Sequence, residues 1–144
     1  MTSIEERRNK QWLAPAKYRA AATVVMGGID SDIDTEEWNG RLYLEMPRRD
    51  RLEYAQRLVS LVERGEVTEA VVLAVNATET RWYRAIAGIS SAWCLHAGRI
   101  RFTDKEGGTN LPIQGQVILY VGSNTSRFSE VFSDFGTILT PIKE

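Results

Sequence analysis

The spacing of apolar residues along the chain predicts four amphipathic helices. In the first, apolar positions recur at helical intervals after Pro15, and Gly27 and Gly28 end the pattern. Asp50 is a suitable N-cap for the second helix, and Ser126 is one for the last. The predicted helices are 15–26, 50–65, 80–87 and 126–135.

Shorter apolar runs between these helices predict strands. The run Val71–Val75 is continuously aliphatic, which is typical of a central strand buried on both faces. The segment 104–115 is rich in Gly, Asn and Pro and connects two strands that we expect to pair antiparallel, 99–103 and 116–121. The order of elements predicts a three-layer α/β fold, mostly parallel, with an antiparallel hairpin toward the C-terminus. The predicted strands are 41–45, 71–75, 92–95, 99–103, 116–121 and 137–139.

Length and composition favour one compact domain in the cytoplasm. A chain of 144 residues is the size of one domain, which we assign to 12–144 after a flexible arm at 1–11. The N-terminus is charged where a signal peptide is apolar, and no apolar run is long enough to cross a bilayer. The lone Cys94 forms no internal disulfide, as expected in a reducing compartment.

Charge is nearly balanced overall but uneven along the chain. The net charge is −1, from 18 basic and 19 acidic residues, which argues against a uniformly basic nucleic-acid-coating protein. Fourteen of the basic residues are arginine, a residue suited to forked recognition of phosphate or carboxylate, although codon bias also produces this excess. An acidic run at 30–37 precedes a cluster of three arginines at 48–51, so we expect two opposite patches near each other.

Several familiar chemistries are absent from the sequence. It has no dinucleotide-binding or Walker loop, no nucleophile elbow and no zinc-protease motif. The only histidine, His96, lies two residues from Cys94 on a predicted strand, where both fit ordinary half-buried positions. The acidic run fails as a calcium loop because Thr35 and Arg41 stand where glycine and glutamate are required. It fits a solvated loop, or an acidic surface that meets an arginine-lined partner or mimics DNA phosphates.

Two of the four tryptophans border polar segments. Trp82 lies at helical spacing with Tyr83 and is expected in the core, as are the phenylalanines of the last helix. Trp12 and Trp38 are instead candidates to stack on a base or to anchor a partner interface.

An ordered series of short motifs covers about residues 11 to 139. The motifs are Gln11–Tyr18, Val25–Asp30, Trp38–Leu44, Val71–Leu73, Thr78–Tyr83, Gly98–Phe102, Gly115–Gly122, Arg127–Phe132 and Phe135–Gly136. In this order they resemble the phage-type DNA N6-adenine methyltransferases. The resemblance implies a Rossmann-like methyltransferase sheet, S-adenosylmethionine as donor and a target adenine flipped from the duplex.

The chain departs from this family at the catalytic segment. The family places Asn-Pro-Pro-Tyr or Asp-Pro-Pro-Trp after a strand, so that an amide or carboxylate holds the exocyclic amine and the aromatic ring stacks on the base. Here the segment is Leu44–Arg48, in which Glu45 replaces the shorter acceptor, Pro47 is the one remaining proline and Arg48 replaces the ring.

A second departure removes part of the cofactor side. Only 31–37 separates Asp30 from Trp38, where the family has an acidic Asp-Pro motif and a further βα stretch. The fold is therefore expected to be truncated there, with Trp12 and Asp30 as remnants of the cofactor pocket.

These departures favour a catalytically degenerate phage or prophage protein that acts by binding, with no cofactor and no metal. The expected partner is nucleic acid or a host-defence complex, as for an anti-restriction or anti-CRISPR inhibitor. Two alternatives stay open: a working S-adenosylmethionine-dependent enzyme that uses Glu45 and Pro47, and a half-domain completed by another chain or by a homodimer. The predicted partner-binding residues are Asp32, Asp34, Glu36, Glu37, Trp38, Arg48, Arg49 and Arg51.

Overall fold

The computed structural model describes residues 12–142, so the predicted arm at 1–11 lies outside them. The described residues form one six-stranded sheet and a small two-stranded sheet, β5–β6. In the large sheet the strand order is β1-β2-β3-β7-β4-β8. The strands are β1 (Ser31–Asp32), β2 (Gly40–Glu45), β3 (Val67–Val75), β4 (Ala92–His96), β5 (Phe102–Thr103), β6 (Thr109–Asn110), β7 (Gln116–Val121) and β8 (Gly136–Leu139).

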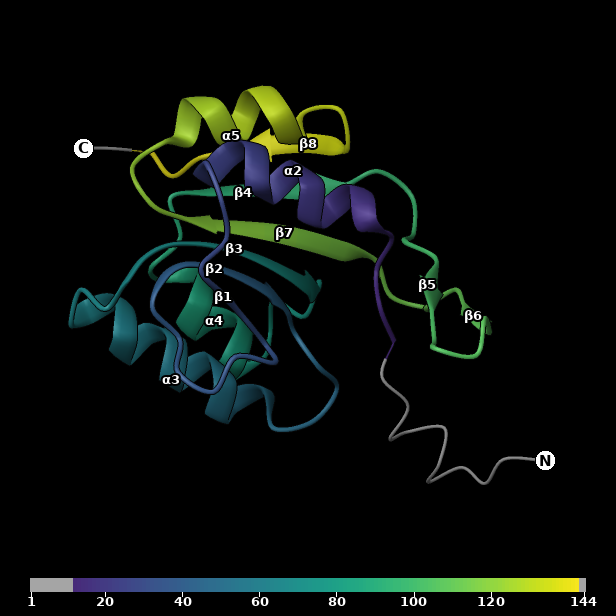
Figure 1. The fold of residues 1–144 in the computed structure, drawn as a ribbon. Coiled ribbons are helices and arrows are strands. Elements are labelled where there is room, and N and C mark those ends of the chain that lie inside the picture. Colours follow the sequence, from purple (N-terminus) through teal and green to yellow (C-terminus); the bar gives the residue numbers. More distant parts are fainter. Residues whose placement is uncertain (1–11, 143–144) are drawn as a thin grey trace.

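Helices cover both faces of the large sheet and make three layers (Figure 1). On one face lie α2 and α5, and on the other lie α3 and α4. Strands β1 to β4 run in one direction, while β7 and β8 run in the other. The predicted α/β class with a mostly parallel sheet is therefore confirmed. The helices are α2 (Ala16–Met26), α3 (Arg51–Glu63), α4 (Arg81–Ala87) and α5 (Thr125–Phe132).

The predicted helices are all present, the predicted N-cap position of Asp50 is confirmed, and that of Ser126 is wrong. Asp50 precedes α3 in a left-handed conformation, and its side chain makes no capping hydrogen bond. At α5 the cap is Asn124 rather than Ser126, and the Asn124 side chain accepts a hydrogen bond from the Arg127 N–H. The end of α2 is as predicted, because Gly27 adopts the left-handed conformation that closes a helix.

The predicted antiparallel pairing of 99–103 with 116–121 is wrong. Strand β7 lies between β3 and β4 and pairs antiparallel with both, whereas β5 pairs with β6. All six residues of β7 are buried. A strand this apolar loses more exposed surface inside a sheet covered on both faces than in a surface hairpin, which accounts for its central place.

The protein has one hydrophobic core on each face of the large sheet. Strand β3 contributes to both, because its side chains alternate between the two faces. Ala70, Val72 and Ala74 pack toward α3 and α4. Val71 and Leu73 pack toward α2 and α5. The predicted central position of this strand is confirmed, since it pairs with β2 on one side and β7 on the other. Among residues 12–142, no helix is both long and apolar enough to span a membrane.

Candidate functional site

A cavity of about 530 Å³ lies at the carboxyl ends of β2 and β3. The carboxyl edge of parallel strands is where α/β proteins place their ligands, because loops there diverge and leave a crevice. In Figure 1 this edge is the right-hand side of the sheet, next to β5 and β6. The lining residues are Trp12, Leu13, Arg19, Asp32, Ile33, Asp34, Tyr43, Glu45, Met46, Pro47, Arg48, Arg49, Arg51, Leu73, Val75, Phe102, Asn110, Pro112, Gln114 and Gln116.

One wall of the cavity is the chain from β6 to the start of β7. Every second residue of this segment lines the cavity, beginning with Asn110 and ending with Gln116. Between β6 and β7 the segment forms no strand and bends at 113–114, so it lines the cavity as a loop. Gln116 is only 8% exposed, and among the described residues no hydrogen bond to its side-chain amide is found. The wall therefore presents amide groups able to pair with a polar ligand.

Aromatic rings make much of the remaining lining. Phe102 comes from β5 and Trp12 from the segment before α2, whereas Tyr43 of β2 is 3% exposed and presents little of its ring. Leu13 fixes that segment to β5, because the N–H of each of Leu13 and Thr103 donates to the carbonyl of the other, at 2.7 and 2.9 Å. Planar apolar surfaces of this kind suit a flat heterocyclic ligand.

Glu45 lies at the end of β2, and both of its carboxylate oxygens are already occupied. Oε1 accepts a hydrogen bond from the Ala14 N–H at 2.8 Å, and Oε2 accepts one from the Tyr43 hydroxyl at 3.0 Å. Burial nevertheless raises the pKa of the Glu45 carboxyl above its ordinary value. The geometry thus uses this carboxylate to hold α2 against the sheet and leaves no oxygen without a hydrogen-bonding partner.

Three arginines from the loop after β2 form the basic side of the cavity. Arg48 and Arg49 are exposed. Arg51 is more constrained: its Nε donates to the Pro47 carbonyl at 2.9 Å, and its guanidinium lies 5.3 Å from the centre of the Trp82 ring. Burial lowers the pKa of Arg51, and the neighbouring Arg48 lowers it further. Arg48 and Arg49 are therefore the two that can turn toward a ligand without disturbing the fold.

The opposite side of the cavity is acidic. Asp32 and Asp34 line it, so the predicted proximity of an acidic and a basic patch is confirmed for these residues. The Asp32 carboxylate pairs with Arg19 of α2 at 3.1 Å, and the Arg19 guanidinium lies 5.6 Å from the centre of the Tyr43 ring. Because Arg19 also lines the cavity and neutralises Asp32, the unpaired negative charge on this side is that of Asp34, and a phosphate is favoured at the arginine side.

The remaining residues of the predicted partner surface lie elsewhere. Glu36, Glu37 and Trp38 line a separate shallow depression against α3. The prediction that Trp38 offers a stacking surface is wrong for this structure, because the side chain is 3% exposed. One of its neighbours is the Tyr54 ring, with centroids 5.9 Å apart, and the Arg57 guanidinium lies 4.0 Å from the Trp38 ring centre.

The two residues expected to remain from a cofactor pocket are not brought together. Trp12 lines the cavity, but Asp30 does not. The Asp30 carboxylate makes an ion pair with Arg41 at 2.8 Å, and this bond holds the Asp30 pKa near 2. A Cβ added at Gly28 would meet the Arg41 guanidinium at 2.9 Å. Arg41 thus fills the space beside Gly28 and Asp30.

Sequence reasoning missed several lining residues, among them Arg19, Phe102 and the amides of the wall at 110–116. Their signal was weak: Asn110, Gln114 and Gln116 are spaced by even numbers, but the Pro and Gly between them are typical of a simple loop. Cys94 and His96 are ordinary structural residues, as expected. The Cys94 thiol donates to the Phe132 carbonyl at 3.4 Å, and His96 Nε2 hydrogen-bonds the Tyr18 hydroxyl at 2.7 Å.

The fold and cavity define an α/β protein with a ligand-type site at the carboxyl edge of its sheet. Comparison with known proteins adds no family to this description: no family model, no curated protein and no solved structure matches the chain. Within residues 12–142, no three His, Cys, Asp or Glu side chains group so as to hold a metal ion.

The raised pKa of Glu45 predicts a specific pH dependence of stability. The folded protein keeps a proton on this carboxyl at pH values where the unfolded chain has lost it, so its contribution to the free energy of unfolding falls as pH rises through that window. The variant Glu45→Gln lacks this titration and should gain stability relative to the wild type as pH rises above the ordinary glutamate pKa. Urea denaturation of both proteins from pH 4.5 to neutrality measures the difference in their free energies of unfolding. The titration of groups that both proteins share, such as Asp30, cancels in this difference. A difference that is constant or of opposite sign contradicts the prediction.

Proposed function

We propose that this protein is a catalytically degenerate, methyltransferase-like binding protein that takes an unpaired nucleotide of a nucleic acid into the cavity. The observation that carries the proposal is a single cavity of about 530 Å³ that combines aromatic and amide walls with an arginine rim. Each component matches one part of a nucleotide, as follows.

The base fits the interior of the cavity. Aromatic side chains such as Trp12 and Phe102 offer stacking surfaces for a heterocycle, and Gln114 and Gln116 offer both donors and acceptors for its edge. A base paired inside a duplex has neither its faces nor its Watson–Crick edge accessible to such a cavity, so the ligand is an unpaired nucleotide.

The phosphate fits the rim. Arg48 and Arg49 are exposed at the same cavity and carry no ion pair among the described residues. Arginine is the side chain best suited to forked binding of phosphate oxygens. Asp34 on the opposite side of the cavity, whose carboxylate has no ion pair among the described residues, favours the phosphate at this side.

Binding without methyl transfer is supported by the state of two carboxylates. Each oxygen of Glu45 already accepts a hydrogen bond from this chain, which fixes the carboxylate in a structural role. The Asp30 carboxylate is bound by Arg41 and lies outside the cavity lining. The arrangement supports a pocket that recognises a nucleotide and releases it unchanged.

Two titrations test the proposal. Fluorescence anisotropy with a labelled mixed-sequence DNA strand of about 20 nucleotides should give saturable binding that weakens steeply with salt. Calorimetric titration with S-adenosylmethionine should give no heat of binding. Failure to bind the DNA strand removes nucleic acid as the partner and makes a host-defence protein complex the next candidate.

The second candidate is an S-adenosylmethionine-dependent adenine methyltransferase with a variant motif. One observation favours it, since Glu45 and Pro47 line the same cavity as Trp12. Two results together would favour the methyltransferase over the nucleotide-binding function. These are one-to-one binding of S-adenosylmethionine and production of methylated adenine that is lost in Glu45→Ala. A homodimer that completes the pocket would be recognised by light scattering at twice 16.3 kDa.

A further inference from the structure

The segment 110–116, which forms one wall of the cavity, also carries exposed apolar side chains. Pro112 and Gln114 line the cavity, whereas Ile113 between them does not line it and is 87% exposed. Leu111 does not line the cavity either and is 49% exposed. Exposed aliphatic side chains are expensive to keep in water, and next to a nucleotide cavity they offer a surface on which a neighbouring base can stack.

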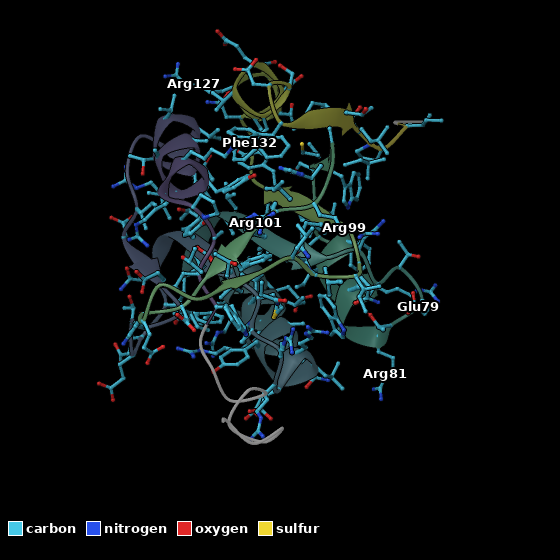
Figure 2. All side chains as sticks on the ribbon, turned by 90° about the vertical axis from the view of Figure 1, so that its right-hand side faces the viewer. Glu79, Arg81, Arg99, Arg101, Arg127 and Phe132 are labelled. Carbon is cyan, nitrogen blue, oxygen red and sulfur yellow. The ribbon has the colours of Figure 1, made fainter. Side chains whose placement is uncertain are left out.

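A second group of arginines, which sequence reasoning did not single out, lies close to this wall in the chain. Arg99 and Arg101 are exposed and belong to the connection between β4 and β5, and Phe102 beside them lines the cavity. Figure 2 looks at the side of the molecule on which β2 and β3 end, and it shows both arginines near the middle of the view. Neither forms an ion pair among the described residues.

The charges of the adjoining turn do not cancel this pair. Lys105 and Glu106 oppose each other, and the Asp104 carboxylate is turned inward, where it accepts the N–H groups of Glu106 and Gly108 at 3.0 and 2.7 Å. Exposed basic groups therefore come from two segments next to the cavity lining, Arg48 and Arg49 after β2, and Arg99 and Arg101 just before Phe102 of β5. The side with Asp34, whose carboxylate has no ion pair among the described residues, is the least favourable for a phosphate backbone.

We infer that a single nucleic-acid strand runs across this face from Arg48 and Arg49 over Ile113 to Arg99 and Arg101. The inference rests on the proposed function and extends it from one nucleotide to a strand of several. One nucleotide enters the cavity, a neighbouring base stacks on Ile113, and the next phosphates meet the second arginine pair. The site is thus specific for single strands. Its affinity rises with strand length until the strand covers the whole path between the two arginine pairs.

The test uses labelled oligothymidylate strands of about 4 and about 12 nucleotides, which have no partner strand to pair with. The wild type should bind the longer strand at least about tenfold more tightly. The double variant Arg99→Gln/Arg101→Gln should lose most of this advantage and should reduce the slope of log affinity against log salt by about 1.4, since each lost contact to a single strand removes about 0.7. Ile113→Ser should weaken the longer strand about fivefold with the slope unchanged, because a stacking contact releases no counterions.

Two control variants accompany this test, and its outcomes separate a failure of the strand path from a failure of the proposed function. Arg84→Gln/Arg127→Gln removes the same charge from helices α4 and α5, and Ile142→Ser changes an isoleucine that is 94% exposed near the C-terminus. Both should bind like the wild type. If Arg99→Gln/Arg101→Gln also binds both strands like the wild type, the path is overturned while the cavity function stands. If the wild type binds neither strand, the proposed function itself fails.

Discussion

Reversing two charges, in Arg48→Glu/Arg49→Glu, is expected to weaken binding of a single DNA strand by about 100-fold or more at low salt. Both side chains are exposed at the cavity, so each favourable phosphate contact becomes a repulsion while the fold is left intact. Arg51 is left unchanged because its hydrogen bond to Pro47 and its packing on Trp82 are structural. Anisotropy titrations at several salt concentrations measure the loss, which should shrink as salt screens the charges.

The matched control is Arg84→Glu/Arg127→Glu, which changes the net charge by the same amount away from the cavity lining. It should lose little affinity. Equal losses in the two variants would mean that overall charge, and not the cavity rim, governs binding. Unchanged affinity in Arg48→Glu/Arg49→Glu would remove these two arginines from the site.

The largest expected effect on stability comes from Phe132→Ala. Phe132 is fully buried, stacks on Phe128 with ring centroids 4.8 Å apart, and contacts the tilted ring of Phe135 at 5.5 Å. Deleting a buried aromatic ring costs about 3–5 kcal/mol, from lost burial and from the cavity left behind. That is a large part of the roughly 5–15 kcal/mol that stabilises a typical domain. Urea denaturation followed by far-ultraviolet circular dichroism gives the change in the free energy of unfolding.

Ile142→Ala is the control for this prediction, because Ile142 is exposed and should change stability by less than about 0.5 kcal/mol. A loss below about 1 kcal/mol in Phe132→Ala would contradict the packing described for α5. The result also bears on the site, since α5 packs beside α2, and α2 carries Arg19 to the cavity.

Local sequence patterns were sufficient for most elements of the fold. The helical spacing before Gly27 and the aliphatic run at Val71–Val75 each belong to a stretch whose own residues determine its structure. Helix caps were harder to predict because several polar residues near a helix start compete for the same position. At α5, Ser126 and Asn124 both suit a cap, and only the backbone geometry chooses Asn124.

Strand partners and the candidate site were only partly predictable. The sequence indicated Glu45, Pro47 and the arginines 48–51 as neighbours because they are consecutive in the chain. It gave no sign that Gln116 or Phe102 would face them, since these residues come from distant segments. Trp38 was misjudged because a polar neighbourhood in sequence does not exclude burial under α3 in space.

The sequence alone therefore determined the α/β class, the central place of β3 and the arginine cluster after β2, because periodicity and local charge are properties of consecutive residues. Only the tertiary structure decided that β7 lies between β3 and β4 and that 110–116 forms a wall of the cavity. It also decided that the Glu45 oxygens are occupied by Ala14 and Tyr43. These features depend on which distant segments meet, and that choice follows from the total burial of apolar surface over the whole chain, which no local pattern contains.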